Sequence, residues 1–332
     1  MESSRVRRDP RDRRARPSRH RPLLHGTLAT VVVLCGTAAG TAYVKTGARP
    51  GVRAVSSAAM PSASISAAAG GEASVEPTVD HDVLLAGAMK AVDVEDGAAV
   101  SVAVLDLDSG ASATYGNGFF DTASIVKVDI LAALLLQAQD AGRELTAAER
   151  SYATDMIEYS DNTAASALWR TIGRADGLEA ANVRLGLKET VGGDGGYWGL
   201  TRTTAADQLR LLRQVFEAAG SELTADSRAY VAGLMGQIAA DQRWGVSAVA
   251  DGSGWALKNG WLPRTATGLW DINSIGRVTV AGADYLVAVL SGGNSTKQQG
   301  VSLVEAAARA AVSVFIGEDV SGSPAVTTPA TP

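Results

Sequence analysis

Residues 121–139 read DTASIVKVDILAALLLQAQ, a polar start followed by an almost unbroken apolar run. An apolar run of this length predicts a buried helix over 125–139. Ser124 lies at the start of that helix, and Lys127 lies three residues further on. Side chains three residues apart share one face of a helix, so the hydroxyl and the amine are predicted to be neighbours.

A hydroxyl beside an amine at a helix N-terminus suits acyl transfer. The unpaired backbone N–H groups of the first turn can stabilise an oxyanion, and the amine can act as the base. Lys127 can accept a proton at neutral pH only if burial or another cation lowers its pKa from about 10.4. The same pattern also fits an ordinary helix start with an incidental lysine, so it needs support from elsewhere in the chain.

The composition excludes several other kinds of site. The only histidines are His20, His25 and His81, and the only cysteine is Cys35. A Ser-His-Asp triad, a Cys-His pair, a histidine-based metal site and an internal disulfide are therefore excluded from the body of the chain. Because nine arginines fall within residues 1–22 and the formal net charge is −5, the body is acidic and has no broad surface for nucleic acid.

The elements around the central helix predict an α+β fold. Strands from the two ends of the chain should pair into one antiparallel sheet flanked by the terminal helices, with an all-helical lobe between them. A capping box at Thr146 and Glu149 opens one helix of that lobe. The predicted helices cover 80–92, 163–172, 204–219, 224–239 and 301–315, and the predicted strands cover 99–107, 111–115, 255–259, 267–274, 277–280 and 285–290.

The chain divides into five segments by composition. Residues 1–22 are read as a basic cytoplasmic tail, and the uncharged run 23–44 as a transmembrane anchor or a signal sequence. Residues 45–80 form an Ala/Ser/Gly-rich linker, 81–318 the catalytic domain, and 319–332 a disordered tail. In either interpretation of 23–44 the arginines stay inside, so the domain is extracytoplasmic, either secreted or anchored to the membrane through 23–44.

Two further motifs follow in the sequence. Ser160-Asp161-Asn162 lies in a loop between predicted helices, where such residues also serve as ordinary caps. Lys258-Asn259-Gly260 lies on a predicted strand before Trp261, where the lysine can hold a carboxylate and the glycine lets a ligand come close. The alternative for this second motif is a solvated lysine at a strand end.

Taken in order, Ser124-x-x-Lys127, Ser160-Asp161-Asn162 and Lys258-Asn259-Gly260 resemble the motif set of class A β-lactamases and penicillin-binding proteins. The resemblance covers about residues 82–316. It implies that Ser124 attacks the carbonyl of a β-lactam or a D-alanyl peptide, and that no metal or organic cofactor is needed.

The resemblance also implies a role for each motif residue. Lys127 would be the base, Ser160 would pass the proton to the leaving nitrogen, and Asn162 would bind the substrate amide. Lys258 would hold Ser160 and the substrate carboxylate, and would help to keep Lys127 neutral. Asn259 and Gly260 would contact the substrate, and the backbone N–H groups of Ser124 and Trp261 would form the oxyanion hole.

Three departures from the class A pattern bear on activity. Asn259 replaces the more usual threonine, and the interval of 36 residues between Ser124 and Ser160 is short. A deacylating glutamate followed four residues later by asparagine is not evident. Glu189 stands at about the right distance, but Gly193 occupies the asparagine position, so a solvated loop carboxylate is the alternative for Glu189.

The leading hypothesis is an exported serine hydrolase of class A β-lactamase type, which works through a Ser124 acyl-enzyme. If no group activates water for deacylation, the alternative is a D-Ala-D-Ala peptidase of the penicillin-binding type or an esterase-like hydrolase. A catalytically silent module of the cell envelope, which keeps the fold without turnover, is the third hypothesis.

Overall fold

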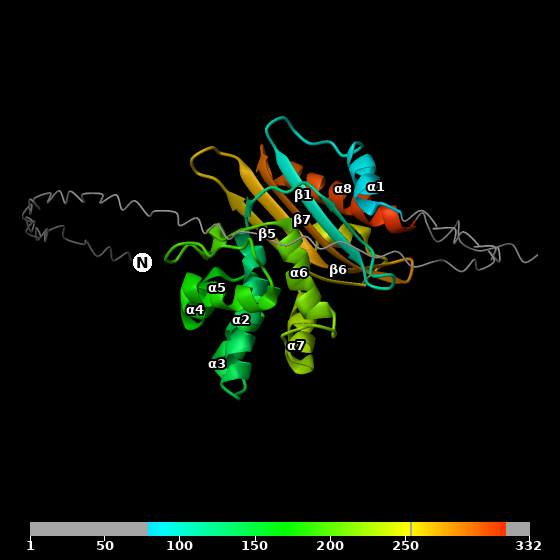
Figure 1. Ribbon diagram of the computed structural model, residues 1–332. Coiled ribbons are helices and arrows are strands. Elements are labelled where there is room, and N and C mark those ends of the chain that lie inside the picture. Colours follow the sequence, from blue (N-terminus) through cyan, green and yellow to red (C-terminus); the bar gives the residue numbers. More distant parts are fainter. Residues whose placement is uncertain (1–78, 253, 317–332) are drawn as a thin grey trace, which may run out of the picture. The chain divides into compact units, whose positions relative to one another are not determined.

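A five-stranded antiparallel sheet forms the centre of the computed structural model, which describes residues 79–252 and 254–316 (Figure 1). The strand order is β2-β1-β7-β6-β5. Strands from both ends of the domain therefore lie side by side, as the sequence predicted, with Ala103 of β1 opposite Ala288 of β7. The strands are β1 (Ala99–Asp106), β2 (Ser112–Tyr115), β5 (Trp255–Pro263), β6 (Trp270–Val280) and β7 (Ala283–Asn294).

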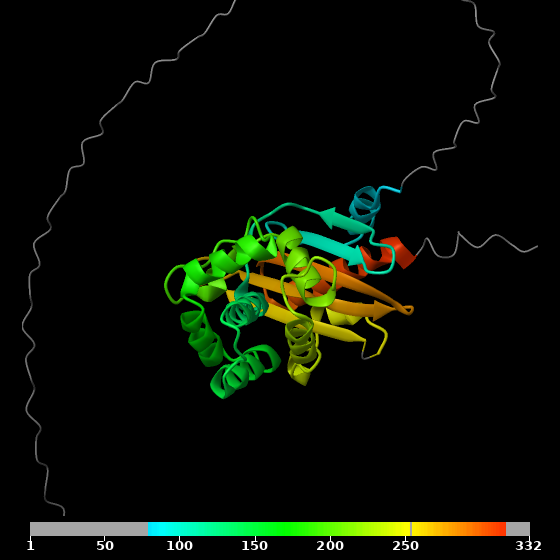
Figure 2. The same ribbon diagram turned by 60° about the horizontal axis from the view of Figure 1, so that its bottom comes forward.

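Both faces of the sheet are covered. Because side chains alternate along a strand, Leu286, Ala288 and Leu290 of β7 pack toward the helical lobe, while Val287 and Val289 pack toward the terminal helices. Those terminal helices, α1 (His81–Met89) and α8 (Lys297–Ile316), share one face of the sheet (Figures 1 and 2). By length and composition α8 could cross a membrane, but 56% of its apolar window is buried inside the domain, as in a core helix.

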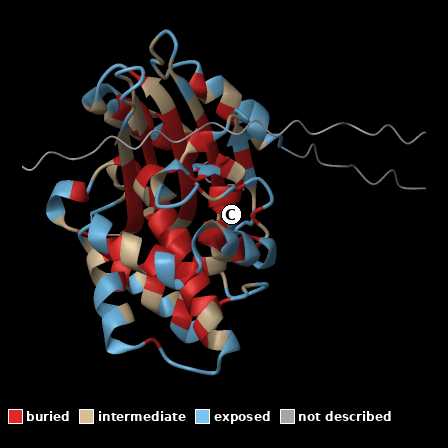
Figure 3. Ribbon diagram, turned by 90° about the vertical axis from the view of Figure 1, so that its left-hand side faces the viewer, coloured by how far each residue is buried: buried red, intermediate tan, exposed pale blue. Residues whose placement is uncertain are grey.

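The helical lobe is built around α2 (Val126–Asp140). Twelve of its residues are buried, so the helix is covered on nearly all sides (Figure 3). Thr146 and Glu149 form the predicted capping box at the start of α3. The other helices of the lobe are α3 (Ala147–Glu158), α4 (Asn162–Thr171), α5 (Arg174–Leu185), α6 (Ala205–Phe216) and α7 (Ala225–Met235).

Helix α5 and two strand assignments differ from the sequence prediction. Helix α5 has little amphipathic pattern in its sequence, and Gly177 lies within it. A Cβ at Gly177 would lie 1.7 Å from the carbonyl oxygen of Ile172, so only glycine permits this close approach. The same glycine lowers the helix propensity of the segment, and for that reason the helix was not predicted. The two strands expected at 267–274 and 277–280 form one continuous strand, β6. A short antiparallel pair was not predicted; it joins β3 (Phe120–Asp121) to β4 (Arg202–Thr203). The predicted segments 1–22, 23–44 and 319–332, and the linker 45–80 except for its last two residues, lie outside the described residues.

Asp129 is a fully buried carboxyl group in the middle of α2. With the Asn182 amide turned so that its nitrogen faces Asp129, that nitrogen donates to both carboxyl oxygens at 3.0 and 3.1 Å. Burial raises the pKa of Asp129 from 3.8 to about 8, in spite of this amide donor. The folded chain therefore holds a neutral carboxyl group here at neutral pH.

Replacing this residue, as D129N, should make the protein more stable at neutral pH and above. Between pH 4 and about 8 the unfolded chain loses the Asp129 proton while the folded chain keeps it, so native stability falls as pH rises. The difference in unfolding free energy between D129N and the native chain should grow by up to about 1.4 kcal/mol per pH unit over that range. Urea unfolding from pH 4 to 8 measures it, with the exposed Asp108→Asn as control. A difference that does not change with pH would mean that Asp129 is ionised in the fold.

Candidate active site

The three motifs meet at the junction of the sheet and the helical lobe. The Lys127 amine donates hydrogen bonds to the Ser160 carbonyl oxygen at 2.7 Å and to the Ser160 hydroxyl at 3.1 Å. The Lys258 amine donates to the same hydroxyl at 3.0 Å. The Ser160 hydroxyl therefore lies between two amines from different elements, one at the start of α2 and one on β5.

Ser124 is held where strand β5 meets the start of α2. It lies in a short 3-10 turn, Ala123–Ile125, that leads into the helix. A Cβ at Gly260 of β5 would lie 2.8 Å from the Ser124 backbone nitrogen and 2.7 Å from the Thr122 carbonyl oxygen. Only glycine lets the strand come this close, so Gly260 sets the distance between the two motifs.

Two residues beside the reactive groups have left-handed backbone conformations. Ala123, which precedes Ser124, has a φ of 49°, and Ser160 has a φ of 56°. Such conformations cost non-glycine residues about 1–3 kcal/mol and persist where the surrounding structure fixes them. At both positions the fold therefore keeps a strained backbone conformation that lowers the stability of the folded chain.

Both amines are poor sites for a positive charge. Lys127 is fully buried, and this burial lowers its pKa from 10.5 to about 7 against the opposing charge of Asp161. Burial also lowers the pKa of Lys258 well below its ordinary value, and the charge of Lys127 lowers it further. Since a proton on one amine disfavours a proton on the other, the pair supplies a neutral amine near pH 7.

A cleft with a volume of about 560 Å3 opens above this cluster and contains Ser124 in its wall. Asn162 also lines it, and the Asn162 side-chain oxygen accepts from Lys127 at 2.9 Å. Within the described residues the Asn162 amide nitrogen has no partner, so it is free to donate to a ligand. The other lining residues are Ala123, Ser166, Gly196, Tyr197, Trp198, Gly199, Leu200, Trp261, Leu262, Pro263, Arg264, Thr265 and Ala266.

Two of the predicted binding side chains make their contacts with residues outside the Ser124 cluster. Along β5, Lys258 and Gly260 face the site, so the alternating residues Asn259 and Trp261 face the other side of the strand. The Asn259 amide donates to the carbonyl oxygens of Gln242 and Trp244 at 2.8 and 2.9 Å. The expectation that the Asn259 side chain contacts the substrate is therefore not supported, because both amide hydrogens are used.

The Trp261 ring is likewise engaged elsewhere. Its centroid lies 6.1 Å from that of Trp244, and the Lys297 amine lies 4.2 Å above the Trp261 ring. Trp261 lines the cleft next to Gly260, where its backbone N–H, rather than its ring, is the group suited to an oxyanion.

Glu189 is exposed and does not line the cleft. Its carboxylate accepts a hydrogen bond from the Thr204 hydroxyl at 3.3 Å, at the start of α6. The described residues that line the cleft include no aspartate or glutamate at all. The placement of Glu189 thus favours the alternative of a solvated loop carboxylate over that of a deacylating base.

Ser166 and Arg264, which lie in the wall of the cleft, were not predicted from the sequence. Ser166 follows Asn162 by four residues on α4, and this spacing is a signal that would have placed both on one helix face. Arg264 is the one charged residue among the described residues that line the cleft, and it pairs with Asp121 and with Asp271, the latter at 3.7 Å. Nothing in the sequence pattern indicates this pairing across distant segments.

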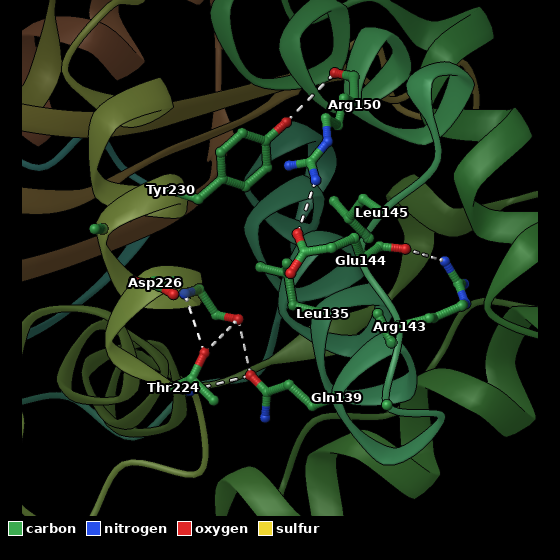
Figure 4. Close-up of a pocket in the computed structure, with 13 residues that line it drawn as sticks. Leu135, Gln139, Arg143, Glu144, Leu145, Arg150, Thr224, Asp226 and Tyr230 are labelled. Carbon is green, nitrogen blue, oxygen red and sulfur yellow. Dashed lines mark hydrogen bonds and ion pairs between the residues drawn. The ribbon is translucent and has the colours of Figure 1, made fainter.

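A second cavity, of about 600 Å3, lies at the far end of the lobe beside α7 (Figure 4). Both of its lining arginines are paired: Arg150 contacts Glu144 at 2.8 Å, and Arg143 contacts Glu149 at 2.8 Å. No hydroxyl in it lies beside a lysine amine. The smaller cleft at Ser124 is therefore the candidate active site.

Comparisons with known proteins identify the family and the fold. A family model described as "Beta-lactamase enzyme family" matches residues 141–315. Curated relatives named "Putative lipoprotein LppW", from Mycobacterium bovis and Mycobacterium tuberculosis, are each 30% identical over 174 residues, which cover 50% of this chain and 55% of the relative. The chain thus spans about half the length of the curated relatives that it matches.

Solved structures share the fold at lower identity. PBP-A has a TM-score of 0.61 and 20% identity, over 71% of this chain and 96% of that chain. The TLA-1 extended-spectrum β-lactamase has a TM-score of 0.61 and 15% identity, over 71% and 98% of the two chains. A class A β-lactamase from Bacteroides cellulosilyticus has a TM-score of 0.59 and 17% identity, over 71% and 97%. At these identities the likeness establishes the fold.

Proposed function

The chain belongs to the beta-lactamase enzyme family, and we propose that it is a penicillin-binding serine hydrolase in which Ser124 forms a long-lived acyl-enzyme with β-lactams. Its natural substrate on this proposal is an amide with a free carboxylate, such as a D-alanyl peptide. The observation that carries the proposal is a cleft that has Ser124 in its wall and, among the described residues, no carboxylate in its lining. Beside it lie two buried amines that share the Ser160 hydroxyl, one of which also binds the lining residue Asn162.

Acylation uses the amines as the base and the proton relay. The neutral Lys127 amine takes the Ser124 hydroxyl proton, directly or through a water molecule, as the serine oxygen bonds to the carbonyl carbon. The C–N bond of the substrate then breaks, and its nitrogen receives a proton from the Ser160 hydroxyl, which is replenished by the lysine pair. The hydrogen bonds from Lys127 and Lys258 to Ser160 support this route.

Charge that develops on the carbonyl oxygen needs donors in place beforehand. The backbone N–H groups of Ser124 and Trp261 are proposed to supply them, because Gly260 brings β5 against the Ser124 turn. A substrate carboxylate near Lys258 favours its protonated form and so leaves Lys127 neutral.

Deacylation separates the two enzymatic hypotheses. An opened β-lactam keeps its leaving nitrogen tethered to the acyl group, whereas a cleaved peptide releases its leaving amine. A tethered group obstructs water, and none of the described residues that line the cleft carries a carboxylate to activate that water. This favours a penicillin-binding peptidase over an efficient β-lactamase.

Intact-mass measurement of the full chain with a reporter penicillin tests the proposal. We expect one adduct per chain that persists for many minutes, no adduct on Ser124→Ala, and a normal adduct on the exposed control Ser151→Ala. A transient adduct with rapid product release would instead support a β-lactamase. The absence of any adduct would support the silent envelope module.

The cell envelope is the proposed location. The name of the curated relatives describes a lipoprotein, and the uncharged run 23–44 is proposed to anchor or export the domain. Either placement brings the site close to cell-wall peptides.

A further inference from the structure

Trp198 covers the amine that the proposed reaction uses as its base. The centre of its ring lies 4.9 Å from the Lys127 amine nitrogen, and Trp198 lines the cleft. No other aromatic ring contacts this amine within the described residues. The indole therefore packs over the buried amine and forms part of the cleft wall.

One face of α4 holds this ring in place. Asn162, Ser166 and Trp169 are spaced at four and three residues, so they share that face. Asn162 binds the Lys127 amine at 2.9 Å, and the Ser166 hydroxyl accepts from the Trp198 indole N–H at 3.1 Å. The same helix thus positions the base and the ring that covers it.

The third residue of the face fixes the segment that carries Trp198. The indole N–H of Trp169 donates to the Gly195 carbonyl oxygen at 2.8 Å, and Trp169 itself is almost fully buried. The segment is also closed on itself, because the Tyr197 backbone N–H bonds to the Asp194 carbonyl oxygen at 3.0 Å. A Cβ at Gly193 would lie 2.2 Å from the Tyr197 carbonyl oxygen, so the segment is tightly packed there. Trp198 is therefore presented by a rigid support.

We propose that Trp198 is a positioning residue, clamped by Ser166 on α4, that keeps bulk water from the Lys127 amine and from the acyl group on Ser124. The contact between the Trp198 ring and the Lys127 amine has two consequences for the reaction. Exclusion of water keeps the amine neutral and ready to accept the Ser124 proton, and it also slows hydrolysis of the acyl-enzyme. This inference rests on the proposed function, since it gives that site its base and its long acyl-enzyme lifetime.

The variants Trp198→Ala, Trp198→Phe and Ser166→Ala test the proposal in the full chain. For Trp198→Ala we expect the pH midpoint of acylation by penicillin to rise by about one unit, because water reaches the amine. The adduct on Ser124 should also decay about tenfold faster. Ser166→Ala should shift both quantities in the same direction by less, and Trp198→Phe, which keeps an aromatic ring, should stay nearer the native values.

Trp255→Phe, which alters a ring beside Arg243 and away from the cleft, serves as the matched control. A merely structural role for Trp198 would lower stability without moving the pH midpoint. If Trp198→Ala keeps the native midpoint and the native adduct lifetime, the proposal is wrong. If Trp198→Ala does not fold, the same comparison on Ser166→Ala and Trp198→Phe decides it.

A fluorescence titration without ligand keeps this test separate from the proposed function. The native-minus-Trp198→Phe emission should change with a midpoint near pH 7, as the nearby amine gains its charge, and the change should vanish in Lys127→Met. If penicillin forms no adduct on the native chain but the emission still changes near pH 7, the proposed function is wrong and the contact between Trp198 and Lys127 is confirmed. If the emission does not change near pH 7, Trp198 does not contact the Lys127 amine and the inference is wrong.

Discussion

Replacing Lys127 with methionine lowers the rate constant for acylation of Ser124 by about a thousandfold, within the range that general-base catalysis contributes. Methionine fills a similar buried volume but cannot accept the serine proton or donate to Ser160. Stopped-flow or quenched mass measurement with a reporter penicillin gives the rate constant. The exposed Lys90→Met should leave it unchanged. An acylation rate for Lys127→Met within a few-fold of the native value would show that another group is the base.

The same residue sets the pH dependence of the native chain. Lys127 must be neutral to accept a proton, and its lowered pKa of about 7 means that the neutral form is lost as pH falls below 7. Acylation should therefore slow about tenfold per pH unit below 7 and level off above it. A rate that does not change between pH 5 and 8 contradicts this assignment.

Gly260→Ala should impair both folding and acylation. The added Cβ would lie 2.7 Å from the Thr122 carbonyl oxygen, 2.8 Å from the Ser124 nitrogen and 3.0 Å from the Ile125 nitrogen. All three are backbone atoms, so β5 and the Ser124 turn must move apart. We expect a loss of about 1–3 kcal/mol in unfolding free energy. Acylation should fall by at least about a hundredfold, because the Ser124 N–H leaves its position for the oxyanion.

Gly233→Ala in α7 is the matched control for this substitution. A Cβ there meets nothing within 4 Å, and alanine favours the helix, so stability should hold or rise slightly. Thermal unfolding and adduct formation are measured on both variants. The comparison separates the effect of the close backbone contact at Gly260 from that of adding a methyl group to any glycine. Native acylation by Gly260→Ala would mean that close strand approach is not needed.

The features that could be predicted from the sequence are those with a local signal. The apolar run after Ser124 predicted α2, the capping box predicted the start of α3, and the alternating terminal strands predicted the antiparallel sheet. Helix α5 could not be predicted in this way, because Gly177 lowers helix propensity locally while it allows packing against Ile172. The contact joins the end of α4 to the start of α5 and leaves no periodic trace in the sequence.

The orientation of the side chains in the third motif could have been predicted from the sequence. If Lys258 and Gly260 face the site, the period of two along a strand turns Asn259 and Trp261 away from it. Glu189 is a different case, because its position depends on how a glycine-rich loop closes against α4 and α6. Motif spacing measures distance along the chain, and it does not fix where such a loop places its carboxylate.

The pairing of β1 with β7 has a consequence for biosynthesis. Ser124, Ser160 and Lys258 lie on successive parts of the chain, and the strand that separates β1 from β6 is β7, which ends only at Asn294. A chain that emerges amino-terminus first therefore holds its serine and its first amine long before the sheet that orients them can close. On the proposed function, the site is therefore complete only after β7 has been synthesised, late in folding.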